Sequence, residues 1–208
     1  ARVSEAGIAF MHAMELEGVI ACGKHFPGHG DTKSDPHIEL PILDTSIDQL
    51  RARELLPFKA LIDAGIGMLM TSHILFRKMD SAFPATLSQI VSGLLREELG
   101  FSGTVISDDV GMRAMDSFFA DPVAPARFLG AGNDLLMICS HWTDTRRARD
   151  FQAAVERGLA ARVVTEDQLR ESWLRTERLL RRTPQHEVRA LKPEMFAASH
   201  NSAPLFEG

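Results

Sequence analysis

Residues 23–37 contain three histidines, two aspartates and Lys24 in a stretch that glycine and proline interrupt repeatedly. The histidines are His25, His29 and His37, and the aspartates are Asp31 and Asp35. The interruptions exclude a continuous helix or long strand, so these side chains belong on a loop that follows the apolar run 19–22. Imidazole, ammonium and carboxylate groups on a loop can bind a polar substrate and transfer protons. A hydrophobic core needs none of them.

Other apolar runs along the chain also end in reactive side chains. The runs 19–22, 67–71, 104–107 and 134–139 predict four strands. The groups at their ends are Lys24 and His25, then Ser72 and His73, then Ser107, Asp108 and Asp109, and finally Ser140 and His141. Catalytic groups at the C-terminal ends of several strands are typical of the (β/α)8 barrel.

Helical patterns alternate with these strands. They predict helices at 4–16, 47–64, 87–99, 112–119, 124–130, 144–161 and 166–182. Short, continuously apolar strands between helices are typical of a parallel sheet covered on both faces. Half of a (β/α)8 barrel and a small doubly wound sheet both fit this alternation, and the strand-end side chains favour the barrel. A complete barrel has eight strands and typically about 250 residues, so we expect the C-terminal part of a barrel whose N-terminal strands are missing.

Capping residues predict where two of these helices begin and end. Ser46 can cap the helix at 47–64 and Gly65 can end it, while Thr86 and Gly100 can do the same for the helix at 87–99. The chain begins inside a helical pattern without an initiator Met, which predicts that the true N-terminus is missing. We expect one domain at 1–182 and an irregular C-terminal tail at 183–208.

Composition limits the classes of partner. The 208 residues are 45% hydrophobic and carry a formal net charge of −5, which suits a globular core and gives no reason to expect nucleic acid or an anionic membrane as a partner. An apolar run of about 20 residues, as a transmembrane helix requires, is absent. Cys22 and Cys139 each lie in an apolar run, so we expect reduced thiols in the core rather than a disulfide.

Several ordered motifs resemble the family 3 glycoside hydrolases, most closely their bacterial β-N-acetylglucosaminidase branch. The first is Gly23-Lys-His-Phe-Pro-Gly-His-Gly30, followed by Asp35-Pro-His37 and Leu40-Pro41. The resemblance continues through the motifs at 54–58, 70–73, 84–88, 94–103, 105–112 and 131–137. It covers roughly residues 1–180. It implies a barrel domain that removes a terminal β-linked N-acetylglucosamine and keeps the anomeric configuration.

The resemblance implies that Asp108 is the nucleophile. A retaining glycosidase needs one carboxylate to form a covalent glycosyl-enzyme intermediate and a second group as acid/base. Asp109 is the neighbouring rival. Because adjacent strand residues point to opposite faces, at most one of the two can face the barrel mouth. We expect Asp109 to cap the following helix.

By the same resemblance, His37 is the acid/base and Asp35 orients it. A histidine has an ordinary pKa of about 6.5, so it can exchange a proton near neutral pH. A carboxylate on the far ring nitrogen fixes the tautomer and stabilises the imidazolium. The branch usually has Ser between these two residues, where this chain has Pro36. Proline restricts the backbone here, which predicts altered loop motion. The alternative for His37 is a solvated loop histidine.

The remaining candidates are substrate-binding residues. Lys24 and His25 match the sugar-binding pair of the family, and burying Lys24 at a strand end would require a partner. His29 can shape the loop around the sugar, and His73 is either a pocket residue or a structural histidine. Asp134 and His141 are weaker candidates. Surface positions are expected for His12, His186 and His200.

Two other functions remain open from the residues alone. His25, His29, Asp31, Asp35 and His37 include zinc-type ligands, which a metal-dependent hydrolase could use, although Pro27 and Gly28 keep the first two from sharing a helix face. A non-catalytic saccharide-binding relative is the second alternative. The favoured reading is a cytoplasmic exo-β-N-acetylglucosaminidase acting on muropeptides in peptidoglycan recycling, with no cofactor and no metal. Because an open half-barrel exposes strand edges, we expect the missing N-terminal half of the barrel as its partner.

Overall fold

A four-stranded parallel sheet forms the centre of the computed structural model, which describes residues 2–139 and 146–183. Its strands are β1 (Cys22–Phe26), β3 (Met68–Thr71), β5 (Thr104–Asp109) and β6 (Leu135–Met137), in the order β1-β3-β5-β6. Neighbouring strands pair in parallel, as expected when a helical connection after each strand returns the chain to the end of the sheet where that strand began. The four predicted strands are therefore confirmed, although β1 begins at Cys22, where the predicted run 19–22 ends, and extends into the histidine-rich segment.

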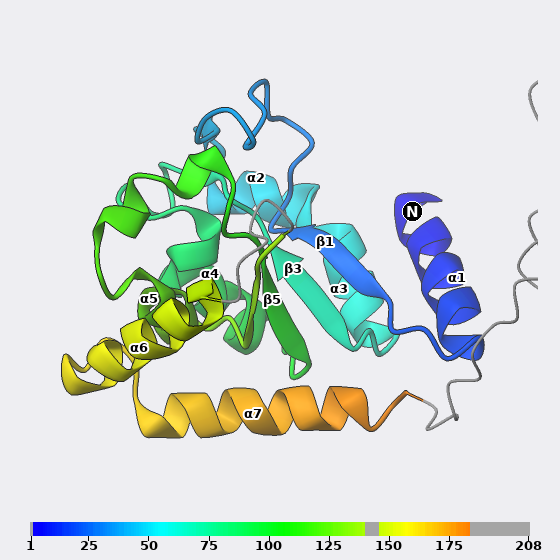
Figure 1. Ribbon diagram of the computed structural model, residues 1–208. Coiled ribbons are helices and arrows are strands. Elements are labelled where there is room, and N and C mark those ends of the chain that lie inside the picture. Colours follow the sequence, from blue (N-terminus) through cyan, green and yellow to red (C-terminus); the bar gives the residue numbers. More distant parts are fainter. Residues whose placement is uncertain (1, 140–145, 184–208) are drawn as a thin grey trace, which may run out of the picture.

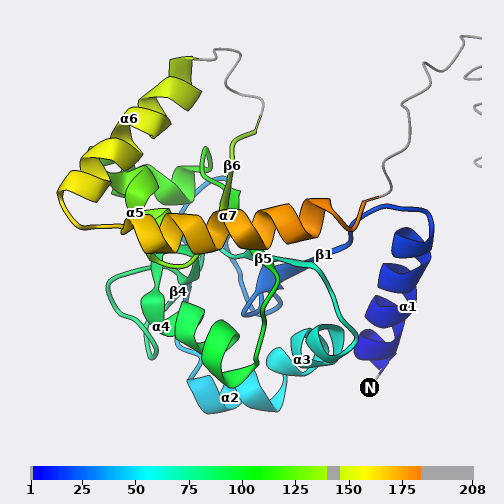
Figure 2. The ribbon, with the colours of Figure 1, turned by 90° about the horizontal axis from the view of Figure 1, so that it is seen from below.

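The helices flank this sheet (Figure 1). The α-helices are α1 (Arg2–Leu16), α2 (Ile47–Ala52), α3 (Leu55–Asp63), α4 (Gln89–Gly93), α5 (Ala124–Gly130), α6 (Arg146–Ala160) and α7 (Glu166–Leu180). The other helical segments are the 3-10 turns η1 (Ala85–Leu87), η3 (Arg113–Met115) and η4 (Phe118–Ala120), and the π-helix η2 (Leu94–Glu98), which continues from α4. Helices α2, α3 and α4 pack on the face of the sheet that carries Phe26, Leu69 and Val105. Helix α7 passes beneath the sheet, at the end opposite the loop that follows β1 (Figures 1 and 2). Within the described residues, no helix is long and apolar enough to cross a membrane.

The helix predicted at 47–64 is two helices, α2 and α3. The break falls at Arg53–Glu54 because Pro57 has no N–H to donate to residue 53, and its ring would clash with that carbonyl in a continuous helix. In the separate helix α3, Pro57 lies in the first turn, where the missing N–H costs nothing. Ser46 caps α2 through a full capping box with Gln49, as predicted. Gly65 follows α3 with φ +88°, also as predicted.

Two other helix predictions were wrong in detail. Thr86 does not cap α4; Ser88 does, accepting a hydrogen bond from the N–H of Val91. Thr86 is buried and its hydroxyl is 3.0 Å from that of Thr71. The helix predicted at 112–119 is replaced by the two turns η3 and η4, since Asp116 and Ser117 between them are poor helix formers. Gly100 ends η2 with φ +73°.

A second, two-stranded parallel sheet was not predicted. It pairs β2 (Ile42–Leu43) with β4 (Leu75–Phe76). Strand β2 follows the histidine-rich loop directly, so that loop is held by β1 at its start and by β2 at its end. The two sheets together therefore fix the two ends of the segment that carries most of the candidate residues.

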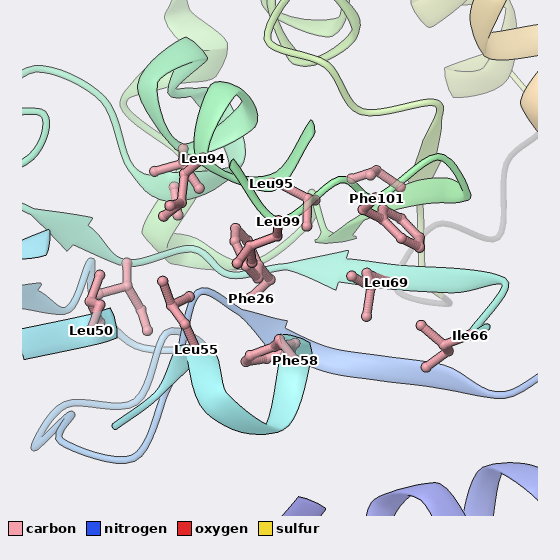
Figure 3. Close-up of a cluster of buried hydrophobic side chains, with 14 of the residues drawn as sticks. Phe26, Leu50, Leu55, Phe58, Ile66, Leu69, Leu94, Leu95, Leu99 and Phe101 are labelled. Atoms are coloured by element: carbon pink, nitrogen blue, oxygen red, sulfur yellow. The ribbon is translucent and has the colours of Figure 1, made fainter. Parts of the chain in front are cut away.

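The main hydrophobic core fills the space between the sheet and the helices α2, α3, α4 and η2. Phe26 is fully buried at the end of β1 and meets Phe58 of α3 edge-to-face, with ring centroids 5.2 Å apart. Leu69 of β3 and Leu95 of η2 belong to the same cluster (Figure 3). Edge-to-face aromatic pairs add about 0.5–1.5 kcal/mol beyond their buried area. The core thus holds the end of β1, from which the candidate loop departs.

The two cysteines differ in environment, and both are free thiols. Cys22 is largely enclosed, and burial raises the pKa of its thiol to about 11, which makes it unreactive. Cys139 is exposed. The prediction of a core thiol is therefore wrong for Cys139, because β6 ends at Met137, before the end of the apolar run.

Candidate active site

Asp108 lies near the C-terminal end of β5, and its side chain is almost fully buried. One carboxylate oxygen, Oδ1, accepts a hydrogen bond of 2.9 Å from the N–H of Asp109. The other, Oδ2, is 3.6 Å from Nε2 of His25 on β1. The sheet thus brings together two of the predicted site residues, which are far apart in the sequence.

Asp109 has a structural role instead. Its Oδ1 accepts hydrogen bonds from the N–H groups of Gly111, at 2.9 Å, and Cys139, at 3.0 Å. It does not cap a helix as predicted, because the residue at the N-cap of η3 is Met112. Asp109 instead joins the end of β5 to the segment after β6, which leaves Asp108 as the carboxylate available for chemistry.

His25 and His29 form a pair beside Asp108. Their ring centroids are 5.2 Å apart, and Nδ1 of His29 is 2.9 Å from the hydroxyl of Thr32. Burial lowers the pKa of His25, and the negative charge of Asp108 opposes this only in part. His25 is therefore neutral near pH 7, and its 3.6 Å contact with Asp108 is longer than a hydrogen bond. A neutral imidazole here can present either a donor or an acceptor to a substrate hydroxyl.

Lys24 and His73 differ from what their place at strand ends suggests. Lys24 is exposed and has no hydrogen bond or ion pair within the part of the chain that the structure describes, so its role in sugar binding stays a prediction. His73 is only 1% exposed. Its Nε2 donates a 3.0 Å hydrogen bond to the carbonyl of Asp109, and burial lowers its pKa. This favours the structural alternative for His73, as a support for the end of β5.

Asp35 and His37 form a hydrogen-bonded dyad on the loop between β1 and β2. Oδ1 of Asp35 is 2.8 Å from Nδ1 of His37 and accepts a 2.9 Å hydrogen bond from the backbone N–H of the same residue. These two bonds hold the pKa of Asp35 below its ordinary value, the backbone bond contributing most. The acceptor on Nδ1 assigns the proton to that nitrogen, which leaves Nε2 free to exchange a proton with a substrate.

A charged cluster at the base of this loop was not predicted. Arg53 forms ion pairs with Asp31 of the loop and with Glu54. The side chain of Glu54 packs against Gly28, where an added Cβ would come within 2.6 Å of Glu54 Cγ. Gly28 also has φ +152°, so only glycine fits there. Asp31 and Arg53 are 22 positions apart in the sequence, and no local pattern signals their contact.

The other weak candidates lie apart from this group. Asp134 is fully buried at the opposite end of the sheet, where it binds Arg96 and Arg175. His12 is exposed on α1. Ser140, His141, His186 and His200 lie outside the described residues, as does the predicted tail apart from Thr183. Among residues 2–139 and 146–183, no three His, Cys, Asp or Glu side chains are placed to bind one metal ion, so the donor arrangement there gives the zinc alternative no support.

A parallel α/β sheet with carboxylate and imidazole groups at the C-terminal ends of its strands is the layout of a barrel-type enzyme domain. Residues 1–179 match the family described as "Glycosyl hydrolase family 3 N terminal domain". Over 199 residues the chain is 34% identical to beta-hexosaminidase A of Pseudoalteromonas piscicida. This alignment covers 88% of this chain and 33% of that protein. It is 37% identical over 141 residues to a beta-hexosaminidase of Thiobacillus denitrificans, covering 67% of this chain and 39% of that one.

A solved structure of a family 3 glycoside hydrolase also resembles this chain. The glycoside hydrolase family 3 β-N-acetylglucosaminidase from a Paenibacillus species aligns with a TM-score of 0.81 and 29% identity, over 93% of this chain and 38% of that one. The chain therefore belongs to glycoside hydrolase family 3, as a member of its N-terminal domain family. It spans 33–39% of the length of these relatives.

Proposed function

We propose that this chain is the catalytic part of a retaining exo-β-N-acetylglucosaminidase, built as the C-terminal part of a (β/α)8 barrel. The observation that carries this proposal is the Asp35–His37 dyad, with 2.8 Å between Oδ1 and Nδ1, on a loop that leaves the same sheet edge as Asp108. A nucleophilic carboxylate and a separate proton donor are the two groups that a retaining mechanism requires.

In the first step, Asp108 attacks the anomeric carbon while His37 protonates the departing glycosidic oxygen. The C1–O bond to the leaving group breaks, and a bond from C1 to a carboxylate oxygen of Asp108 forms. The proton comes from Nε2 of His37, since Nδ1 faces Asp35. Asp35 keeps its negative charge, because its pKa is lowered, and so stabilises the imidazolium that donates the proton.

In the second step, His37 acts as a base. Nε2 removes a proton from water, whose oxygen attacks C1 and displaces Asp108, which leaves as a carboxylate. The sugar is released with its original configuration, because two inversions have occurred. His25, His29 and Lys24 line this edge of the sheet and supply donors for the ring hydroxyls.

The substrate that we propose is a terminal β-linked N-acetylglucosamine on a muropeptide, processed in the cytoplasm during peptidoglycan recycling. The sugar in this proposal is supported by the similar proteins, which are two beta-hexosaminidases and a β-N-acetylglucosaminidase, whereas the muropeptide and the cytoplasmic setting follow from the motif resemblance alone. The remaining barrel strands and further sugar contacts would correspond to the regions of these relatives that do not align with this chain. The domain would occupy residues 1–182, and 183–208 would form a tail.

The test is hydrolysis of a chromogenic β-N-acetylglucosaminide and of the matching β-glucoside, each with a metal chelator present. Selective release from the N-acetyl sugar supports the proposal and removes the metal-dependent alternative. Release from the glucoside alone contradicts the sugar specificity. If neither substrate is cleaved but N-acetylglucosamine binds, the chain is a non-catalytic saccharide-binding relative.

A further inference from the structure

Pro36 is buried although it lies between two exposed residues. The side chains of Asp35 and His37 are 54% and 65% exposed, whereas Pro36 is buried beneath them. A loop that exposes its polar side chains to solvent and buries the residue between them is fixed to the body of the protein at that residue. Proline also restricts its own φ to about −65°, which limits rotation of the chain between the two members of the dyad.

The backbone of Pro36 is fixed as well. Its carbonyl accepts a 3.1 Å hydrogen bond from the N–H of Ala114. Ala114 is buried in η3, and an N–H in the first turn of a helix has no partner inside that helix. The next residue, Met115, is fully buried in a hydrophobic cluster with Val110 and Phe128. The loop is therefore attached to a packed part of the protein.

The same segment carries Asp108. Between Asp108 and Ala114 the chain makes a tight turn, in which Asp109 accepts hydrogen bonds from the N–H groups of Gly111, at 2.9 Å, and Met112, at 3.1 Å. The turn is also held to the segment after β6 through Cys139. A short, hydrogen-bonded path and one hydrogen bond thus connect the nucleophile to the residue next to the acid/base.

We propose that Pro36 is a positioning residue that holds the Asp35–His37 dyad at a fixed place relative to Asp108. It acts through His37 and does not touch the substrate. Its catalytic consequence rests on the function proposed above, while the attachment itself does not. Loss of the attachment should impair proton transfer selectively, because a proton donor must lie within hydrogen-bond reach of the leaving oxygen.

The kinetic test compares Pro36→Ser with Pro41→Ser. Pro41 is a matched control, because it is also buried and its carbonyl accepts a 2.9 Å hydrogen bond from Leu75 at the far end of the same loop. Each variant is assayed on aryl β-N-acetylglucosaminides with good and poor leaving groups. For Pro36→Ser we expect kcat/KM to fall at least about 10-fold more on the poor leaving group. For Pro41→Ser we expect kcat/KM to change by the same factor on the good and the poor leaving group. Equal factors for Pro36→Ser would overturn the proposal.

A second measurement is independent of activity. Amide hydrogen exchange at Ala114, followed by NMR, should show protection in the unaltered chain and in Pro41→Ser, and faster exchange in Pro36→Ser. An unprotected Ala114 amide in the unaltered chain would show that the attachment is absent, and equal protection in both variants would show that the attachment does not depend on Pro36; either result overturns the proposal. If the unaltered chain cleaves no β-N-acetylglucosaminide, the proposed function fails, and the exchange result still decides the role of Pro36.

Discussion

The carboxylate of Asp109 accepts a 3.0 Å hydrogen bond from the backbone N–H of Cys139, which follows it by 30 residues in the chain. This bond joins the ends of β5 and β6 at the edge of the sheet where the candidate site lies. It also separates the roles of two adjacent aspartates, since Asp109 is used for structure and Asp108 faces His25.

The first prediction concerns these two aspartates. Asp108→Asn removes the proposed nucleophile, so turnover should fall on the order of 10⁴-fold or more, as when a covalent nucleophile is removed from other enzymes. Asp109→Asn should lose far less, because the amide oxygen can still accept the hydrogen bonds from Gly111 and Cys139. Steady-state rates on a chromogenic β-N-acetylglucosaminide would decide. The reverse ranking would transfer the nucleophile to Asp109.

The second prediction concerns the dyad. His37→Ala should slow cleavage of substrates with poor leaving groups by about 10²–10⁴-fold, while substrates whose leaving group needs no proton form the glycosyl-enzyme at a similar rate. Asp35→Asn should show the same dependence more weakly, since it removes only the partner of the imidazole. Burst kinetics with an activated aryl glycoside separate the two steps. Identical losses in the first step on both substrate types would exclude His37 as the acid.

The third prediction concerns His73 and pH. Burial lowers the pKa of His73 in the folded state, so the unfolded chain takes up this proton at a higher pH than the folded one. Proton uptake then favours unfolding, and stability should fall as the pH drops below about 6.5, the ordinary value for histidine. His73→Gln keeps a donor for the Asp109 carbonyl but does not titrate. Urea denaturation at pH 7.5 and pH 5.5 should therefore show a smaller pH effect in the variant, and parallel losses in the two proteins would contradict this explanation.

The fourth prediction concerns Asp134, whose side chain is 0% exposed. It accepts hydrogen bonds of 2.9 Å from both Arg96 and Arg175 and one of 2.8 Å from the N–H of Val105. Asp134→Asn removes the carboxylate that the two guanidinium groups share and leaves Arg175 with the exposed Glu171, 3.4 Å away, which should lower the free energy of unfolding by about 3–5 kcal/mol.

The control for this variant is Asp48→Asn. Asp48 pairs with Arg51 at 3.1 Å on the surface, where solvent screens the interaction, so little change in stability is expected. Urea denaturation of both variants provides the measurement. A small effect in Asp134→Asn, equal to that of the control, would show that the buried cluster contributes little.

The strands and the strand-end positions of the candidate residues were predictable from sequence. Short, continuously apolar runs are the direct signature of buried parallel strands, and the polar residue after each run marks the edge where the strands end. The contact of His25 with Asp108 follows from parallel pairing through β3, although these residues are far apart in the chain. The Asp35–His37 dyad was predictable because its members are two positions apart.

Features that depend on distant partners were not predictable. Asp134 was a weak site candidate because its partners, Arg96 and Arg175, are 38 and 41 positions away, and the clustering of Arg53 with Asp31 was missed for the same reason. The break between α2 and α3 was missed because apolar periodicity continues through it, although Pro57 gave a signal. Strand β2 has only two residues, too few for any alternation to be recognised.

The binding of Arg175 to Asp134 has a consequence for the minimum length of an independently folding domain. Arg175 lies on α7, beneath the sheet (Figure 2), so a truncation that ends after α6 would remove one of the two guanidinium groups that bind this carboxylate in the protein interior. Such a product would keep every described strand and every candidate catalytic residue that the structure describes, yet Oδ1 of Asp134 would lose the guanidinium that donates to it, and only Arg96 would remain to pair with the buried carboxylate. Expression and proteolysis boundaries should therefore be placed beyond α7, because this helix supplies a hydrogen-bond donor to a buried carboxylate as well as covering the sheet.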